Sequence, residues 1–78
     1  MPLPPMTPVE SSSLSAIGFD GSVNELYVSF RSGKVYCYFQ VPSSVHRGLL
    51  TAPSLGRYFN ETVRDRYPSL RLRAEESA

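Results

Sequence analysis

The sequence predicts an α+β domain in which a three-stranded antiparallel meander is followed by two C-terminal helices packed on one face. Two observations lead to this prediction. Apolar side chains tend to alternate along residues 14–40, as in strands, and recur at intervals of four over residues 45–67, as in helices. Because the strand segments come first, we expect the order β-β-β-α-α with one core between the two layers.

The size and composition of the chain fit a single small domain. At 78 residues it should bury about 60% of the surface that its unfolded chain exposes. Four of the seven prolines fall within the first eight residues, where they fix backbone angles and remove hydrogen-bond donors. We therefore expect a Pro-rich disordered lead-in over residues 1–10, one domain over residues 11–72 and a disordered acidic tail over residues 73–78.

Residues 14–20 are predicted to form the first strand. Successive side chains of a strand point to opposite faces, so Ile17 and Phe19 would face the core and Gly18 would face outward. Residues 20–22 are typical of turns, and we expect the chain to reverse there into the second strand.

The second and third strands, residues 25–31 and 34–40, are predicted to form a hairpin around a two-residue turn, Ser32-Gly33. This turn pairs apolar residues across the two strands: Phe30 with Val35, Val28 with Cys37, and Leu26 with Phe39. A shift of one residue would set Val28 opposite Tyr36, so we expect the register that keeps the apolar groups together. The other face then carries a mixed set: Tyr27, Ser29, Arg31, Lys34, Tyr36 and Tyr38.

The first helix is predicted after the third strand ends at Val41-Pro42, because proline cannot donate a hydrogen bond to the sheet. Either Ser43 or Ser44 is a candidate N-cap. The helix would contain three apolar positions at helical spacing, namely Val45, Leu49 and Ala52. Pro53 would end it.

The second helix is expected to begin at the N-cap Ser54 and to end before Pro68. Its apolar positions recur every four residues and form a stripe: Leu55, Phe59, Val63 and Tyr67. We expect this stripe to lie across the apolar face of the sheet. The outer side carries the charged residues Arg57, Glu61, Arg64 and Asp65. At i,i+4 spacing, Arg57 would attract Glu61, and Glu61 would repel Asp65.

Charge is distributed unevenly along a chain whose net charge is only +1. Residues 31–73 hold all eight basic residues but only two of the seven acidic ones, which predicts a positive face. No apolar run approaches the ~20 residues that a membrane-spanning helix needs, so we expect no membrane partner. With one cysteine and no visible export signal, we expect a cytoplasmic protein.

The residues that could support catalysis are few. Cys37 falls in the middle of the apolar strand face, where we expect a small buried hydrophobe and not a reactive thiolate. His46 is the only histidine, and no zinc-type spacing accompanies it, so we interpret it as a solvated surface residue. The carboxylates show no spacing typical of acid-base pairs. We therefore predict a protein that is not an enzyme and that uses no metal and no cofactor.

The tyrosine-rich face of the hairpin suggests a binding surface. Aromatic rings stack on unpaired bases and cations attract phosphates, so this composition favours single-stranded nucleic acid, with RNA as the candidate partner. The predicted contact residues are Tyr27, Arg31, Lys34, Tyr36 and Tyr38. Two alternatives stay open: the tyrosines stabilise the sheet without a ligand, or another protein binds this face or an exposed edge strand. The oligomeric state is left undefined.

A second candidate site lies at the start of the second helix, at Ser54, Gly56 and Arg57. Free backbone N–H groups, a glycine that permits close approach and an adjacent cation could together contact a phosphate. The alternative is that Gly56 allows the helix to pack closely on the sheet.

The chain contains several short motifs in a fixed order: Ser12-Ser13, Ile17-Gly18-Phe19-Asp20, Leu26-x-Val28-x-Phe30-x-Ser32-Gly33, Tyr36-Cys37-Tyr38, Val41-Pro42, Ala52-x-Ser54-x-Gly56-x-Tyr58-Phe59-Asn60 and Tyr67. In their order and spacing, these motifs resemble the KTSC domain family over residues 9–72. Family members occur as small stand-alone bacterial proteins and at the C-terminus of some lysyl-tRNA synthetases. The resemblance therefore implies an RNA-binding role, although the family's function is otherwise unassigned. Phe19 stands where the family usually has tyrosine, which removes a hydroxyl there.

Overall fold

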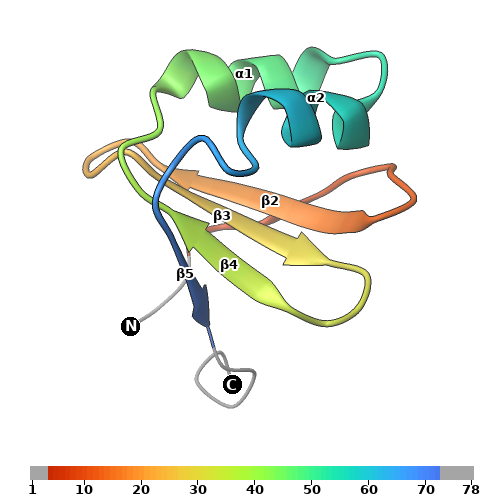
Figure 1. The fold of residues 1–78 in the computed structure, drawn as a ribbon, viewed down its shortest axis with the longest axis horizontal. Helices are drawn as coiled ribbons and strands as arrows, with labels where there is room; N and C mark the ends of the chain where they lie inside the picture. The colour runs from red at the N-terminus through yellow and green to blue at the C-terminus, as the bar shows by residue number, and fades with distance from the viewer. Residues whose placement is uncertain (1–3, 73–78) are drawn as a thin grey trace.

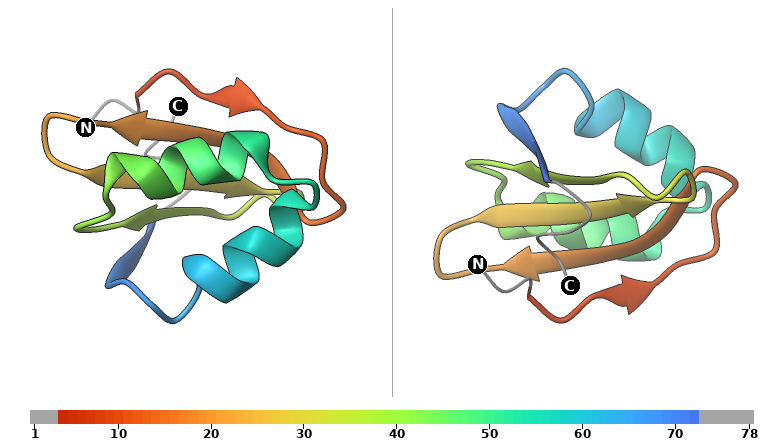
Figure 2. Two further views of the ribbon diagram at one scale, coloured as in Figure 1. Left: turned by 90° about the horizontal axis from the view of Figure 1, so that it is seen from above. Right: turned by 90° about the horizontal axis from the view of Figure 1, so that it is seen from below.

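The computed structural model describes residues 4–72 as a five-stranded antiparallel sheet with two helices on one face (Figure 1). The elements follow one another in the order β1 (Thr7–Pro8), β2 (Leu14–Asp20), β3 (Glu25–Phe30), β4 (Val35–Tyr38), α1 (Ser43–Thr51), α2 (Leu55–Thr62) and β5 (Ser69–Leu72). Strand order in the sheet equals sequence order. The α+β class and the placement of both helices on one face are confirmed, as the view from above makes clear (Figure 2).

Two short edge strands extend the predicted meander. On one side Thr7 pairs with Ile17 and Pro8 with Ala16, within the segment predicted to be a Pro-rich lead-in. Proline is tolerated there because the outer groups of an edge strand need no partner. On the other side β5 pairs with β4. The predicted tail at 73–78 and residues 1–3 lie outside the described part of the chain.

The central hairpin has a different register from the one expected. The observed pairs are Ser29–Val35, Val28–Tyr36, Tyr27–Cys37 and Leu26–Tyr38. The loop has three residues, because Phe30 N donates to Lys34 O at 2.8 Å and Gly33 N donates to Phe30 O at 2.9 Å. Gly33 takes the left-handed position of such a loop, with φ of +97°. The pairing is therefore shifted by one residue.

This shift reverses the predicted faces of β4. Residues directly opposite in an antiparallel pair share a face, so Tyr36 and Tyr38 lie on the helix-covered side with Val28 and Leu26. The far side carries the row Gly18, Tyr27, Cys37 and Leu70. The prediction that all three tyrosines share an open face is therefore wrong.

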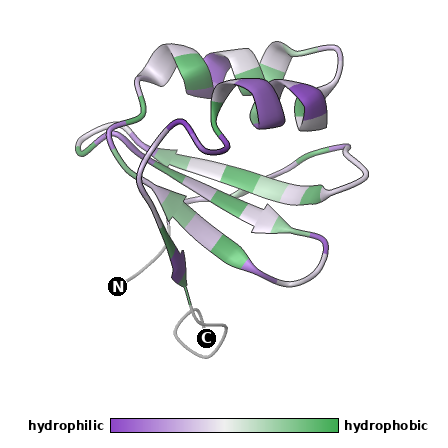
Figure 3. Cartoon of the chain, viewed as in Figure 1, coloured by the Kyte–Doolittle hydropathy of each residue, from purple (hydrophilic) through white to green (hydrophobic). Residues whose placement is uncertain are grey.

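The core lies between the sheet and the helices. It contains Leu14, Ile17, Leu26, Val28, Tyr38, Val41, Val45, Leu49, Phe59 and Val63. Ile17 is buried there and Phe19 packs against it, as expected from the alternation of β2. Gly18 faces away from the helices, but Met6 and Pro5 of the N-terminal segment cover it. Figure 3 shows the corresponding alternation of hydropathy along the strands.

The first helix begins one residue earlier than a serine cap would allow. Its N-cap is Pro42, held extended with φ of −69° and ψ of 151°, and no side chain caps the helix. Ser43 is already helical, so the predicted serine cap is wrong. The helix ends at Thr51, before Pro53, as expected.

The second helix has the predicted start but ends early. Ser54 Oγ accepts a hydrogen bond from Arg57 N at 3.4 Å, which confirms the cap. The helix stops at Thr62, and Asp65 then adopts a left-handed conformation with φ of 61°. The repulsive helical pair of Glu61 with Asp65 is therefore absent from its predicted place. Neither this helix nor any other within residues 4–72 is long and apolar enough to cross a membrane.

Candidate functional site

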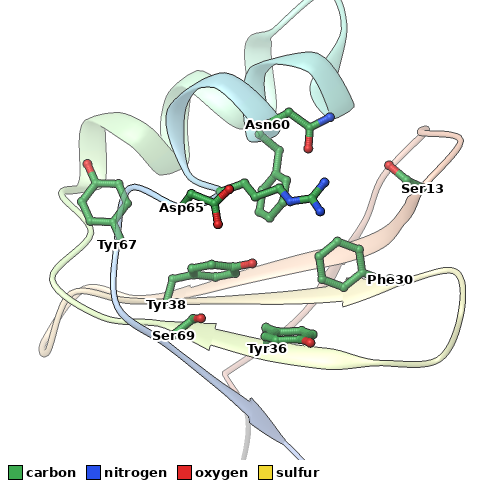
Figure 4. A pocket seen from close by; sticks show the side chains of 10 residues that line it. Ser13, Phe30, Tyr36, Tyr38, Asn60, Asp65, Tyr67 and Ser69 are labelled. Carbon is green, nitrogen blue, oxygen red and sulfur yellow. The ribbon is translucent and has the colours of Figure 1, made fainter.

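A cleft of about 510 Å³ lies between the end of α2 and the strands β4 and β5 (Figure 4). Five aromatic residues line it: Phe30, Tyr36, Tyr38, Phe59 and Tyr67. Five polar residues complete the lining: Ser13, Asn60, Arg64, Asp65 and Ser69. Its volume is in the range of small-molecule sites, which combine apolar walls with a few polar groups.

The two tyrosines of β4 form the floor of this cleft. Their ring centroids are 6.3 Å apart and their planes differ by 27°. Phe59 meets Tyr38 edge to face at 5.6 Å, and Tyr38 is only 6% exposed. Phe30 meets Tyr36 in the same manner at 5.7 Å, but Tyr36 stays half-buried. Tyr38 is therefore a closely packed part of the floor, whereas the ring of Tyr36 is partly open to solvent.

The fifth strand adds a cation beside this open ring. Arg71 lies directly opposite Tyr36 and Ser69 lies opposite Tyr38, so both share the face of the tyrosines. Arg71 is exposed. Sequence analysis missed it because the residues after Pro68 were left outside the sheet, although the alternation of Leu70 and Leu72 was a signal for a strand.

The turn after α2 supplies one charge of each sign. Arg64 and Asp65 were predicted on the outer side of a longer helix, but the early end of α2 turns both toward the cleft. Asp tolerates the left-handed backbone at position 65 better than most residues. Burial raises the pKa of Tyr38, and the neighbouring Arg64 and Asp65 act on that pKa in opposite directions. Figure 4 shows the Asp65 carboxylate facing the Tyr38 ring.

The structure separates the five residues predicted to bind nucleic acid. Tyr27 is 7% exposed on the far face, where its hydroxyl donates to Glu25 Oε1 at 2.9 Å. Burial, with this hydrogen bond, raises the pKa of Tyr27. Arg31 lies in the hairpin loop and donates from Nε to Ser11 O. Lys34 is exposed and lies one position before β4. Because side chains alternate along a strand, we expect it on the same face as Tyr36.

The second predicted site, at Ser54, Gly56 and Arg57, forms a groove of about 500 Å³ beside residues 10–13. Arg57 Nε pairs with Glu61 Oε2 at 3.2 Å, which confirms the attractive helical pair. The carboxylates of Glu10 and Glu61 line the groove and oppose an anion. A Cβ on Gly56 would meet Ser11 Oγ at 3.5 Å, an ordinary contact, so packing does not require glycine. The phosphate contact stays a prediction.

The two residues considered for catalysis lie apart from the cleft. Cys37 is 3% exposed, as a buried hydrophobe should be, and burial raises the pKa of its thiol. His46 is not fully solvated as predicted, because its ring stacks on Phe19 with centroids 4.9 Å apart. Burial, and then Arg47, lowers the pKa of His46. Residues 4–72 contain no group of three or more metal-ligating side chains.

These features define a small α+β domain with an aromatic cleft between its sheet and its last helix. The model of one protein family, the KTSC domain, matches residues 10–67. The chain therefore belongs to the KTSC domain family, as the motifs had suggested.

Relatives of two kinds share this domain. A protein of Tsukamurella paurometabola is 40% identical over 67 residues, covering 86% of this chain and 100% of the relative. A lysine–tRNA ligase of Nostoc punctiforme is 35% identical over 63 residues, covering 81% of this chain but only 11% of the ligase. The crystal structure of a KTSC domain protein from Yersinia pestis superposes with a TM-score of 0.86 at 29% identity, covering 88% and 97% of the two chains.

Proposed function

We propose that this chain is a non-catalytic module that binds single-stranded RNA in the cleft, with a base stacked on the ring of Tyr36. One observation carries the proposal: the half-exposed Tyr36 ring lies in a ligand-sized cleft that Arg64 and Arg71 flank. Aromatic rings stack on unpaired bases, and guanidinium groups contact phosphates.

The surrounding aromatic residues prepare Tyr36 for stacking. Phe30 packs edge to face against its ring, and Tyr38 lies beside it in a nearly parallel plane. A ring that is already held in place loses little conformational entropy when a base stacks on it. The packing therefore favours Tyr36 as the stacking residue and Tyr38 as its support.

The relatives support RNA as the partner. The KTSC domain occurs in proteins named lysine–tRNA ligase, and that name makes a tRNA a substrate of the enzyme. A module joined to such an enzyme would assist it by binding RNA. The stand-alone relatives leave room for RNA partners other than tRNA.

The placement of reactive groups favours binding over catalysis. Cys37 lies on the far face of the sheet, and His46 stacks on Phe19 outside the lining of the cleft. Asp65 lines the cleft without a histidine or cysteine beside it in that lining. A cysteine nucleophile needs an activating base beside it, and a histidine acts as general acid or base only within hydrogen-bond reach of the proton that it transfers.

The proposal is tested by titrating fluorescently labelled single-stranded RNA with the protein at several salt concentrations. Y36A should weaken binding about 10-fold, since base stacking is worth about 1–3 kcal/mol. Y36F keeps the ring and should bind like wild type. Y27F, on the far face, is the matched control and should have no effect.

The salt dependence tests the cations separately. Each phosphate contact on a single strand adds about −0.7 to the slope of log K against log salt. R71Q should therefore make the slope shallower by about 0.7. R47Q removes an exposed arginine of α1 that does not line the cleft, and it should leave the slope unchanged. Wild type that binds no RNA at low salt would refute the proposal, and a protein partner captured after nuclease treatment would then favour the adaptor alternative.

A further inference from the structure

The carboxylate of Asp65 has no partner within the described chain. Among residues 4–72 it accepts no hydrogen bond and forms no ion pair. It nevertheless lines the cleft, and it faces the Tyr38 ring in Figure 4. The two carboxylate oxygens of Asp65, on the helix side of the site, are thus available to accept hydrogen bonds.

A free carboxylate is unfavourable in a site for a polyanion unless it contacts a donor. Arg64 and Arg71 would attract a phosphate backbone, whereas the negative charge of Asp65 would repel it. The repulsion is offset when the carboxylate accepts hydrogen bonds from the bound base, because bonds to a charged acceptor are strong.

From this arrangement we infer that Asp65 makes the cleft selective for guanine, an inference that rests on the proposed RNA-binding function. Guanine alone among the four RNA bases presents two adjacent donors, N1–H and the 2-amino group, on its Watson–Crick edge. A carboxylate accepts both with its two oxygens. Adenine and cytosine have an acceptor beside their amino group, and uracil has a carbonyl on each side of its N–H. Each of these bases would therefore place an acceptor against one of the carboxylate oxygens, which repel it.

The distances across the floor of the cleft suit this contact. The centres of the Tyr36 and Tyr38 rings are 6.3 Å apart. A base stacked on Tyr36 therefore extends one edge toward the space above Tyr38, which is where the Asp65 carboxylate lies. The stacked ring supplies affinity for any base, and Asp65 reads the edge.

The test compares 12-nucleotide oligouridine RNAs that carry one central guanosine, adenosine, cytidine or inosine. Wild type should bind the guanosine oligomer about 10-fold more tightly than the others, which is typical of one bidentate contact. Inosine lacks the 2-amino group and should lose most of this preference. D65N should remove the preference while binding of plain oligouridine stays the same or becomes tighter.

The variants are chosen to keep the fold. Asn and Gly both tolerate the left-handed backbone of position 65, so D65N and D65G should fold, and both should lose the preference. E61Q removes one negative charge from α2 outside the cleft and should keep the preference. A preference that is absent in wild type or persists in D65N would overturn the role of Asp65 and leave RNA binding intact. Failure of wild type to bind any of the oligomers would refute the proposed function itself.

Discussion

Gly48 of α1 should resist substitution by alanine, although alanine favours helices. A Cβ at this position would overlap the Tyr58 hydroxyl and lie 2.5 Å from Tyr58 Cζ. The whole Tyr58 ring would have to move, so the cost should lie in the upper part of the range of about 1–3 kcal/mol for overpacked sites. The higher helix propensity of alanine relative to glycine offsets about 1 kcal/mol of this cost. We expect G48A to lower the free energy of unfolding by about 1–2 kcal/mol.

This prediction is measured by thermal and urea unfolding in a double-mutant cycle with Y58A. For a domain of this size, each kcal/mol corresponds to a shift of about 4–8 °C in Tm. In the Y58A background the clash is gone, so G48A should instead stabilise the protein by about 1 kcal/mol. The sign of the G48A effect therefore depends on Tyr58. A G48A variant that is more stable than wild type, or that has the same effect in both backgrounds, would refute the reasoning.

Three further predictions concern the rest of the domain. G18A should push the N-terminal segment off the sheet, because a Cβ there would lie 2.6 Å from Met6 Sδ. Amide hydrogen exchange should then be faster at Val9, whose N–H donates to Ser15 O. The pKa of His46 is lowered in the folded state, so the unfolded state takes up the proton first, and the free energy of unfolding should fall as pH decreases below ~6.5. In urea unfolding between pH 7.5 and 5.5, H46F should lose less stability than wild type. Cys37 should react slowly with a thiol reagent in native protein and quickly in urea, and fast native labelling would contradict its burial.

The faces within each strand were predictable, but their relative register was not. Alternation correctly placed Ile17 and Phe19 on the core side of β2. The register of the central hairpin depended on whether its loop has two or three residues, and Gly33 is compatible with either length. The three-residue loop sets Val28 opposite Tyr36, and a single step of this kind moves every side chain of β4 to the other face.

The ends of the elements depended on contacts that a local pattern does not contain. The four-residue spacing of apolar positions continues to Tyr67, beyond the end of α2. Tyr67 fits this spacing because it packs on the core, although it lies outside the helix. The left-handed turn at Asp65 interrupts α2 and leads the chain back to the sheet. Tyr36 and Tyr38 were therefore found from the sequence, whereas the cleft positions of Arg64 and Asp65 and the pairing of Arg71 with Tyr36 required the tertiary structure.

The pairing of β5 with β4 has a consequence for how a ligand would be held. Val35 and Leu72 are partners although both helices lie between them in the chain, so this edge closes a long loop that is costly to order. Sheet edges of this kind open locally at lower free energy than the centre. Each opening would carry Arg71 away from Tyr36. A ligand that touches both residues would therefore hold the outer strand on the sheet and slow its detachment.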